Sequence, residues 1–434
     1  MGDDRSDLAL LYRRAGFGLR AAELDQLEAG GYEAAVEQLV GGLGSAADPA
    51  GDHVPLPAFP PYTAPTDAAA RMQAQRAEAE ELAALQTWWM DRMIATSTPL
   101  RERLTLFWHG HFATGAAKVR DVRLMYLQNQ LFRTSGASGF EVLVQGVAKD
   151  GAMMVWLDTI TDKAQHPNEN FARELMELFT LGIGNYTQAD VTAAARAFTG
   201  WTYNRLQYEY LFRAAQHDYG TKTYLGQSGD WNGEDVVHIA VTRPESARFI
   251  VAKLWSHFAY PILWSNRIVD DLLPAYGAGL DIAAVLRALF LHPAFRSGTT
   301  RTGLVKQPVE YLAGAARALG LTATVTSGRA LPQLATALGQ TLFNPPNVGG
   351  WGQNDYWLDS ATAQLRAEIA LLLAGHADLG PVESVSPSGR IGAVAQLLGL
   401  DGFGPTTTAA LHQVEAEPAQ LTALALASPE FVLA

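Results

Sequence analysis

Helix signals with their start and stop residues follow one another along almost the whole 434-residue chain. Residues 67–96 are a long run of strong helix formers, in which Leu82, Leu85 and Trp89 recur at helical spacing. Thr98 before a proline predicts the start of the next helix, because Thr caps free backbone N–H groups and Pro fits the first helical turn. The same reasoning predicts helical segments at residues 7–12, 21–39, 100–108, 122–132, 140–148, 168–181, 187–199, 236–240, 245–258, 281–291, 308–319, 361–374 and 418–427.

Only one part of the chain has a clear strand signal. Aromatic residues alternate with other residues over 208–212, and a second short run covers 221–225. Gly220 and Gly226 bound the second run, as expected for strands that end in turns. The pattern predicts one small β-hairpin, inserted among helices near residues 205–230.

The order of these elements determines the predicted fold class. Strands that do not alternate with helices argue against a doubly wound sheet and against a TIM barrel. Residues 41–66 are rich in Pro and Gly and lack periodicity, so we predict a long loop there. The sequence therefore predicts a mainly α protein, a single large multi-helix globular domain over residues 1–434 with one small inserted β-hairpin.

The composition excludes several classes of function. The formal net charge is −12, whereas a nucleic-acid-binding protein needs a basic surface and an anionic membrane attracts basic chains. The chain has no cysteine, which excludes disulfides, thiolate nucleophiles, cysteine-ligated zinc and iron–sulfur clusters. Any metal ion must therefore be bound by His, Asp, Glu or backbone oxygen.

The N-terminal segment favours a cytoplasmic location. Residues 1–7 are acidic and lack the basic and apolar regions of a secretory signal. The longest apolar stretches, such as residues 369–374, are far too short to span a bilayer. Residues 1–6 match the loose pattern for N-myristoylation at Gly2, but one acyl chain anchors an acidic protein weakly. We expect a soluble, cytoplasmic protein with no nucleic-acid or membrane partner.

The first candidate site is the segment Phe-Trp-His-Gly-His-Phe at residues 107–112. His109 and His111 would share one side of an extended segment, whereas in a helix they would lie about 200° apart. Gly110 favours a non-helical turn here, and two imidazoles on one face would form half of a metal site. The alternative is a helix C-terminus at which the histidines interact with the last carbonyl groups.

The second candidate site is the charged face of the predicted helix over 168–181. Glu174 and Glu177 are three residues apart and Asn170 precedes Glu174 by four, so these side chains share one face. Arg173 follows Glu169 by four residues and also lies among these carboxylates. Paired carboxylates beside Arg and Asn fit acid–base chemistry or metal binding. An ordinary amphipathic helix with a solvated polar face is the alternative.

Two further segments carry candidate residues. His217, Asp218 and Lys222 form a polar group at the predicted hairpin, and either a positioned loop tip or a solvated turn explains it. Residues 342–352 contain a Pro-Pro turn, glycines and an aromatic residue, and so cannot be helical. This segment either forms the wall of a pocket or covers the core. The ten Trp and fourteen Tyr residues suit stacking on a sugar as well as core packing.

Taken together, these segments resemble the bacterial family called domain of unknown function 1800. The matching blocks are Leu-Tyr-Arg-Arg-Ala-Gly-Phe-Gly at 11–18, Leu-Phe-Trp-His-Gly-His-Phe at 106–112, residues 166–182, Thr-Gly-Trp at 199–201, His217 with Lys222 and Gly226, Val-Lys-Gln-Pro-Val-Glu at 305–310 and Asn-Pro-Pro-Asn-Val-Gly-Gly-Trp at 344–351. The resemblance implies an all-helical fold and identifies the candidate sites as family motif segments. Many members carry export signals, which we do not expect here. Their genes often lie beside those of a family resembling alkaline phosphatases and sulfatases, which implies a partner from that superfamily.

From these clusters we expect an enzyme with a cleft lined by His and Glu, a metal-assisted hydrolase of a small or carbohydrate-like polar substrate. A divalent metal ion would leave one coordination position open for water. The expected metal ligands are His109, His111, Glu174 and His217. The residues expected to act in catalysis are Glu169, Arg173, Glu177, Asp218 and Lys222. The residues expected to bind the substrate are Asn170, Trp201, Asn347 and Trp351.

Three other functions fit the same residues. A metal-free glycosidase would use two of the glutamates as acid and as nucleophile or base. A metal-dependent oxidoreductase would use iron or copper bound by His and Glu. In a non-catalytic binding or assembly protein, the Asn/Glu/Arg block would be a buried structural network.

Overall fold

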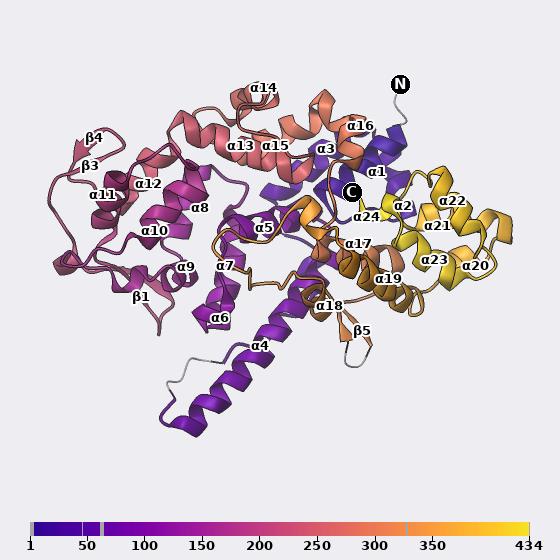
Figure 1. Cartoon of the computed structure of the whole chain (residues 1–434), viewed down its shortest axis with the longest axis horizontal. Coiled ribbons are helices and arrows are strands. Elements are labelled where there is room, and N and C mark those ends of the chain that lie inside the picture. The colour runs from indigo at the N-terminus through magenta and orange to yellow at the C-terminus, as the bar shows by residue number, and fades with distance from the viewer. Residues whose placement is uncertain (1–3, 46, 61–64, 327–328, 434) are drawn as a thin grey trace.

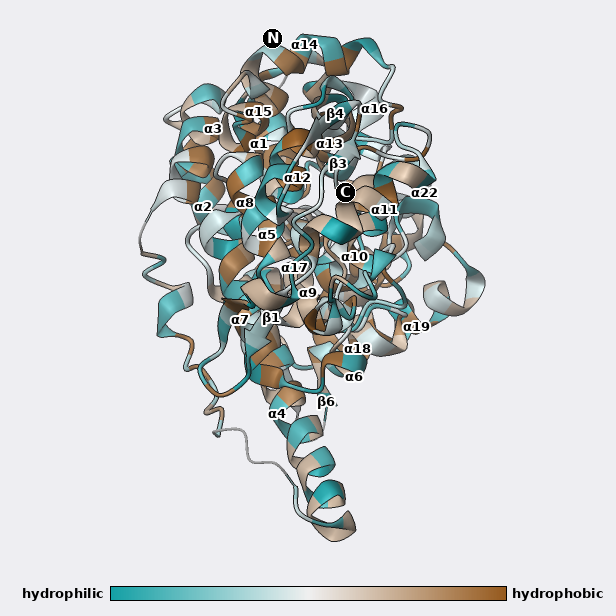
Figure 2. Cartoon of the chain, turned by 90° about the vertical axis from the view of Figure 1, so that its left-hand side faces the viewer, coloured by the Kyte–Doolittle hydropathy of each residue, from teal (hydrophilic) through white to brown (hydrophobic). Residues whose placement is uncertain are grey.

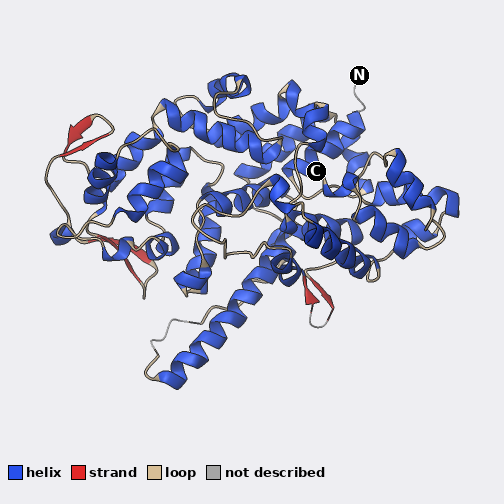
Figure 3. Cartoon of the chain, viewed as in Figure 1, coloured by secondary structure: helices blue, strands red, loops and turns tan. Residues whose placement is uncertain are grey.

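The computed structural model describes residues 4–45, 47–60, 65–326 and 329–433. Over these residues the chain forms 24 α-helices and three two-stranded sheets, which confirms the predicted mainly α fold. The strands lie at the edges of the molecule, away from the helical body (Figure 3). Within the same ranges, none of the helices combines the length and the hydropathy that a transmembrane span needs.

The helices follow one another through the whole chain (Figure 1). The first half contains α1 (Asp4–Ala15), α2 (Ala21–Glu28), α3 (Tyr32–Gly41), α4 (Ala68–Ala95), α5 (Pro99–His111), α6 (Ala116–Val119), α7 (Val122–Ser135), α8 (Phe140–Ala148), α9 (Gly151–Trp156), α10 (Glu169–Glu174) and α11 (Gln188–Phe198). The second half contains α12 (Gly233–Val241), α13 (Pro244–Phe258), α14 (Arg267–Tyr276), α15 (Ile282–Leu291), α16 (Gly298–Thr302), α17 (Pro308–Leu319), α18 (Leu331–Ala337), α19 (Ser360–Ala374), α20 (Gly380–Glu383), α21 (Arg390–Leu397), α22 (Pro405–His412), α23 (Pro418–Leu426) and α24 (Pro429–Val432).

The long helix predicted from residues 67–96 is α4. Asp67 Oδ1 accepts a hydrogen bond from Ala70 N at 2.8 Å, which stabilises the first turn of α4. The N-terminal half of α4 extends beyond the rest of the body, whereas its C-terminal half is packed within it (Figures 1 and 2). The next helix, α5, begins at Pro99 as predicted.

Helix α5 contributes side chains to both large hydrophobic clusters of the protein. Phe107 and Trp108 pack in one cluster, together with buried residues of α8, α10, α13 and α15. Leu106 packs in the other cluster, together with buried residues of α4, α17 and α19. Helices from distant parts of the sequence therefore meet around α5.

The strand prediction is wrong in its pairing, because two hairpins form where one was expected. β1 (Trp201–Asn204) pairs with β2 (Glu209–Phe212), and β3 (Lys222–Tyr224) pairs with β4 (Gln227–Gly229). Each pattern detected in the sequence marks one strand of a pair, and its partner lacks a clear alternation. A tight turn at Leu225 and Gly226, with φ of 46° and 84°, joins β3 to β4. A third pair, β5 (Thr324–Thr326) and β6 (Arg329–Ala330), was not predicted.

The Pro/Gly-rich segment is more ordered than predicted in its first part. Short 3₁₀ turns cover Gly42–Gly44 and Gly51–His53. Asp48 is buried and accepts hydrogen bonds from Thr96 Oγ1 at 2.6 Å and from Ser97 N at 2.9 Å. These bonds attach the segment to the link between α4 and α5. Residues 61–64 of the predicted loop lie outside the described residues.

The predicted helix over 168–181 changes its geometry halfway. Its first part is α10, and its second part is a π-helix at Leu175–Thr180. The backbone N–H groups of Leu181 and Gly182 both donate to Met176 O, at 2.9 and 3.0 Å. Such wide turns are rare and are frequent at functional sites, so the surroundings of this π-helix are of interest.

Candidate functional site

The histidine pair of residues 107–112 does not form a joint site. Helix α5 stays helical as far as His111, so the predicted non-helical turn at Gly110 is absent and the two imidazoles point to different sides. His109 is buried, with its Nε2 3.1 Å from Asn129 Nδ2 and its ring 4.7 Å from the ring of Trp89. Burial lowers the pKa of His109 well below its ordinary value. His109 is therefore a neutral core residue.

His111 faces helix α13 and the π-helix. Its Nε2 lies 3.0 Å from Phe179 O, and its Nδ1 lies 3.3 Å from Lys253 Nζ. Lys253 Nζ also donates to Leu178 O at 3.2 Å. Two consecutive carbonyl groups of the π-helix therefore bind one side chain from α5 and one from α13.

The hydrogen bonds of His111 assign its tautomer. A carbonyl oxygen only accepts, so the bond to Phe179 O places the ring proton of the neutral imidazole on Nε2. Nδ1 is then an acceptor, and Lys253 is the donor. Burial lowers the pKa of His111 well below its ordinary value, and the charge of Lys253 lowers it further. His111 is therefore neutral near pH 7.

Lys253 has the properties of a base. Burial lowers the pKa of Lys253 to about 8. Among the described residues no carboxylate forms an ion pair with Lys253, and its nitrogen lies 4.6 Å from the ring centroid of Phe249. A neutral amine has two N–H groups and one lone pair, and here Leu178 O and His111 Nδ1 accept both N–H groups. The lone pair is left free to accept a proton or to attack a carbon atom.

His111 and Lys253 line a cavity of about 80 Å³, which we call the Lys253 pocket. Its other walls come from α13, from Gln307 before α17 and from the loop that carries Trp351. His257 Nε2 and Trp351 Nε1 are buried, and neither has a hydrogen-bond partner among the described residues. Buried polar atoms are nearly always hydrogen-bonded, so such atoms beside a cavity indicate a place for water or a ligand.

Positive side chains are buried near His257. Arg103 forms an ion pair with Glu310, and its Nε donates to Arg14 O at 3.2 Å. Arg14 Nε and Nη1 are buried without a partner in the described part of the chain, and burial lowers the pKa of Arg14 to about 9. Burial, followed by the charges of Arg103 and Arg14, lowers the pKa of His257 well below its ordinary value. This excess of positive charge favours an electron-rich group in the Lys253 pocket.

Three segments on which the family resemblance rests contribute to this pocket. They are residues 106–112, 305–310 and 344–351. The family model described as "Protein of unknown function (DUF1800)" matches residues 10–433. The chain belongs to the DUF1800 family. Comparison with curated proteins and with solved structures found no match. In this DUF1800 protein, motif segments that are far apart in the sequence thus meet at one cavity.

Glu169 and Arg173, predicted to be catalytic, belong to a network on the surface of this DUF1800 protein. Their side chains form an ion pair at 3.0 Å, and Glu169 also accepts hydrogen bonds from Gln188 Nε2 and Thr192 Oγ1, both at 2.9 Å. The bonds from Gln188 and Thr192 lower the pKa of Glu169. The network joins α10 to α11, and Asn170 beside it is exposed.

Glu174 and Glu177 share one face where α10 meets the π-helix, as the spacing predicted. Burial raises the pKa of Glu174, and the charge of Glu177 raises it further. Glu177 accepts a hydrogen bond from the hydroxyl of Tyr186. Neither carboxylate lines the Lys253 pocket, although the π-helix carries both Glu177 and the carbonyl groups that bind His111 and Lys253.

The predicted loop-tip site at His217 is a packed anchor for the second hairpin. His217 Nδ1 lies 2.8 Å from Thr199 O. Asp218 accepts two hydrogen bonds from Arg196, at 2.6 and 3.1 Å, which lower the pKa of Asp218 to about 2. Lys222 is buried, and its Nζ donates to Asp218 O at 2.6 Å. These contacts hold β3 on α11.

The four predicted substrate-binding residues are in different environments. Trp201 is 1% exposed and lies between the rings of Phe198 and Tyr210, at 5.2 and 5.0 Å, so it is a core residue. Asn347 is exposed and closes a turn by accepting a hydrogen bond from a backbone N–H at 2.8 Å. Of the four, Trp351 lines the Lys253 pocket.

The four predicted metal ligands do not fit a metal site as a set. Among the residues that the structure describes, no group of three or more His, Asp or Glu side chains is placed to hold a metal ion. His109 lies in the core, His111 binds Phe179 O and Lys253, and His217 lies under a hairpin. The helix that continues through Gly110 turns His109 and His111 to different sides. Glu174 and His217 lie on other elements, with packing partners of their own.

Sequence reasoning missed Lys253, His257 and Gln307. Lys253 is the only lysine in α13, and His257 follows it by four residues on the same face. That spacing was a usable signal for a shared site. Gln307 belongs to a motif block that carries the family resemblance, without any local sign of its role.

Proposed function

We propose that this DUF1800 protein is an enzyme that hydrolyses a small polar carbonyl compound in the Lys253 pocket. The observation that carries the proposal is a lysine with a pKa of about 8, whose N–H groups are held by His111 and Leu178. Trp351 lines the same pocket, and its indole N–H has no hydrogen-bond partner among the described residues. Hydrolysis needs a base to take a proton from water and a donor for the carbonyl oxygen. Lys253 and Trp351 both line the pocket, and in the proposed reaction they supply these two functions.

In the proposed reaction, the oxygen of a water molecule attacks the carbonyl carbon while one water proton passes to the lone pair of Lys253. The carbonyl oxygen gains negative charge and accepts a hydrogen bond from Trp351 Nε1. When the intermediate collapses, the ammonium of Lys253 gives the proton to the leaving oxygen or nitrogen. His111 is a positioning residue, because its Nδ1 holds Lys253 Nζ and exchanges no proton itself.

This proposal keeps the hydrolase expectation and Trp351 as a substrate-binding residue, but it assigns the base to Lys253 and a positioning role to His111. The cavity volume of about 80 Å³ limits the reacting group to a few non-hydrogen atoms. The glycosidase alternative depends on Glu169, Glu174 and Glu177, and none of them lines this pocket. A cytoplasmic location and a partner from the alkaline phosphatase superfamily stay predictions.

The base can be tested before a substrate is known. Cyanate, a three-atom reagent, carbamoylates neutral amines, and mass spectrometry can follow each lysine between pH 6 and 11. We expect a half-maximal rate near pH 8 for Lys253, well below the ordinary lysine value, and we follow the exposed Lys163 as the control. A midpoint for Lys253 near that of Lys163 would overturn the proposal. Complete protection at every pH would do so as well, because a substrate could not reach the amine either.

The reaction is then tested with a panel of small esters and amides. Lys253→Met should abolish any hydrolysis found, whereas Lys163→Met should not change it. Hydrolysis that survives in the Lys253 variant places the reaction elsewhere. Treatment with a small ketone and borohydride tests the competing chemistry, in which Lys253 attacks a carbonyl carbon and forms an imine. Borohydride reduces such an imine to a stable adduct, and an adduct on Lys253 would show imine chemistry instead of hydrolysis.

A further inference from the structure

A second and larger cavity, of about 550 Å³, lies near the start of α5. We call it the arginine pocket, because Arg92, Arg101 and Arg133 line it. Arg101 precedes His111 by ten residues, so the two pockets are separated by roughly 15 Å along the helix. None of the residues predicted to be functional lines this cavity. Its volume lies within the range of roughly 300–1,000 Å³ that is typical of small-molecule sites.

Two of the three arginines share one buried carboxylate. Glu102 accepts hydrogen bonds from Arg133 Nε and Nη2, at 2.7 and 2.9 Å, and from Arg92 Nε at 2.9 Å. Burial by itself raises the pKa of Glu102, but the charges and hydrogen bonds of Arg133 and Arg92 outweigh it and hold the pKa below its ordinary value. Arg92 also binds Asp52 at 2.7 Å. The bonds to Glu102 and Asp52 therefore hold the side chains of Arg92 and Arg133 in place without a ligand.

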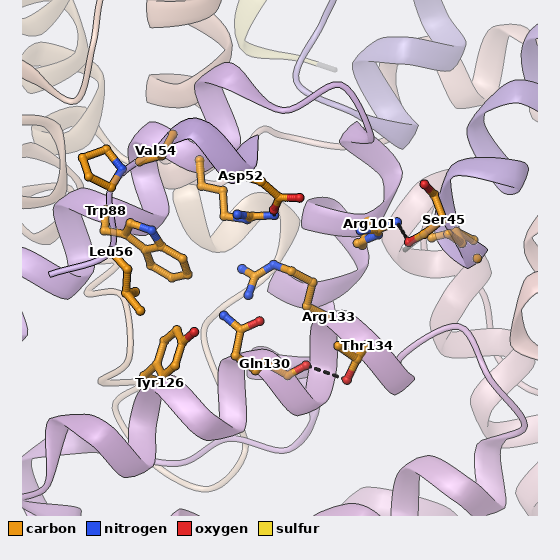
Figure 4. Close-up of a pocket in the computed structure, with 14 residues that line it drawn as sticks. Ser45, Asp52, Val54, Leu56, Trp88, Arg101, Tyr126, Gln130, Arg133 and Thr134 are labelled. Atoms are coloured by element: carbon orange, nitrogen blue, oxygen red, sulfur yellow. Dashed lines mark hydrogen bonds and ion pairs between the residues drawn. The ribbon is translucent and has the colours of Figure 1, made fainter. Parts of the chain in front are cut away.

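The arginine pocket nevertheless has donors without acceptors. Arg101 is 7% exposed and forms no ion pair among the described residues; its Nη2 donates to the backbone oxygens of Gly42 and Ser45. Arg133 is 6% exposed, and its Nη1 has no hydrogen-bond partner in the described ranges. Figure 4 shows the guanidinium of Arg133 directed into the space between Trp88 and the helix that carries Gln130. Burial lowers the pKa of Arg101, and the charges of Asp48 and Glu102 raise it in part. Arg101 Nε and Arg133 Nη1 nevertheless lack a hydrogen-bond acceptor among the described residues, and an oxyanion in the cavity would supply one.

The opposite end of the same cavity is apolar and aromatic. Trp88 and Tyr126 lie there with Leu56, across from Arg101 (Figure 4). The ring centroids of Trp88 and Tyr126 are 5.7 Å apart, and the guanidinium of Arg133 lies 5.4 Å from the centroid of Trp88. A ligand that fills the cavity would therefore meet the rings of Trp88 and Tyr126 at one end, with the guanidinium of Arg133 beside Trp88, and Arg101 at the other end.

We propose that the arginine pocket binds a small organic oxyanion, a carboxylate or a phosphate monoester, that carries an aromatic or other apolar body. The oxyanion accepts hydrogen bonds from Arg101 and from Arg133, and the body packs against Trp88 and Tyr126. This proposal does not depend on the chemistry of the Lys253 pocket, since no residue lines both cavities.

Calorimetric titration of the full chain tests the proposal with four probes: phenyl phosphate, benzoate, inorganic phosphate and neutral benzyl alcohol. We expect saturable binding of phenyl phosphate or benzoate, and the better of the two identifies the oxyanion. Inorganic phosphate and benzyl alcohol should bind at least ten times more weakly, because each fills only one end. Equal affinity for inorganic phosphate or for benzyl alcohol would overturn the two-ended site, as would no binding of any probe.

Variants at the pocket wall locate the site without disturbing the buried arginines. Gln130 is partly exposed and lines the cavity, so Gln130→Glu and Gln130→Lys form a pair of variants of opposite charge. We expect Gln130→Glu to weaken binding of the anion at least tenfold and Gln130→Lys to keep or strengthen it. Equal binding by the two variants would overturn the proposal. The Lys253→Met variant should bind the probes as tightly as the wild type does. This result would show that binding in the arginine pocket is independent of the proposed hydrolysis in the Lys253 pocket.

Discussion

The backbone of Gly350 lies directly against the carbonyl oxygen of Gly110, so that the loop carrying Trp351 packs onto the end of α5. A Cβ atom at position 350 would overlap that oxygen, and the φ angle of 87° at Gly350 also disfavours any other residue. A Cβ at Gly110 would in turn lie 3.7 Å from the ring of Trp351. This close approach of two backbones brings Trp351 to the cavity that holds His111 and Lys253.

Gly350→Ala should therefore displace the loop. We expect a loss of unfolding free energy on the order of 2–3 kcal/mol, because strain at positive φ adds to a clash with backbone that cannot move away cheaply. Thermal or urea unfolding measures it. Gly226→Ala is the matched control, because Gly226 has nearly the same φ, 84°, with nothing within 4 Å of its Cβ position. Equal losses in the two variants would show that the contact with Gly110 contributes nothing.

Lys253→Met should change how stability depends on pH. The pKa of Lys253 is lowered to about 8 in the folded protein, whereas an unfolded lysine keeps its proton up to about 10.5. Between these values the unfolded chain binds more protons, so the stability of the wild type rises with pH over this window. The variant lacks this rise, and the difference between the two proteins should change by on the order of 2–3 kcal/mol from pH 8 to 10.5. Parallel stability curves for the two proteins over that window would contradict the lowered pKa.

Glu174→Gln should leave the protein as stable as the wild type near pH 7, or make it more stable. Burial and the charge of Glu177 raise the pKa of Glu174 in the folded state, so its ionised form costs stability as pH rises through that pKa. The neutral amide removes this cost. Glu169→Gln is the opposite case, because Glu169 accepts hydrogen bonds from Arg173, Gln188 and Thr192. We expect it to lower stability by less than about 1 kcal/mol, as is typical of exposed ion pairs. A large drop in melting temperature for Glu174→Gln would refute this account.

Glu102→Gln should be strongly destabilising. The substitution removes the carboxylate that Arg92 and Arg133 share. Arg133 then has no ion-pair partner among the described residues, whereas Arg92 keeps Asp52. We expect a loss of about 3–5 kcal/mol in denaturant unfolding. Asp52→Asn removes a half-exposed carboxylate from the same Arg92 and should cost far less. Similar losses of unfolding free energy for Glu102→Gln and Asp52→Asn would mean that burial does not decide how much these ion pairs contribute to stability.

Elements whose signals lie within a few residues could be predicted from the sequence. The long helix over residues 67–96 and the proline start of α5 both form as the local patterns indicated. The hairpins were predicted less well, because one strand of each pair has no alternation and the pairing depends on turn geometry. Pairing of this kind is a property of two segments together.

The candidate site could be predicted only in part, for a related reason. The sequence identified His111 and Trp351 as functional candidates, and both line the Lys253 pocket. It also grouped His109 with His111, but a helix that continues through Gly110 turns the two rings apart. Trp201 was expected to bind the substrate, but its ring packs between Phe198 and Tyr210 in the core.

The sequence alone determined the mainly α fold, most helix positions, the lack of cysteine chemistry and the membership of the DUF1800 family, because each depends on local spacing, composition or motif order. Only the tertiary structure decided that Lys253 meets His111, since these residues are 142 positions apart and no local pattern links them. It also decided that Lys253 has no acidic partner within the described part of the chain and is buried beside a cavity, and this burial lowers its pKa. Burial and partner choice arise from the packing of distant helices, so the chemistry of this lysine is a property of the fold.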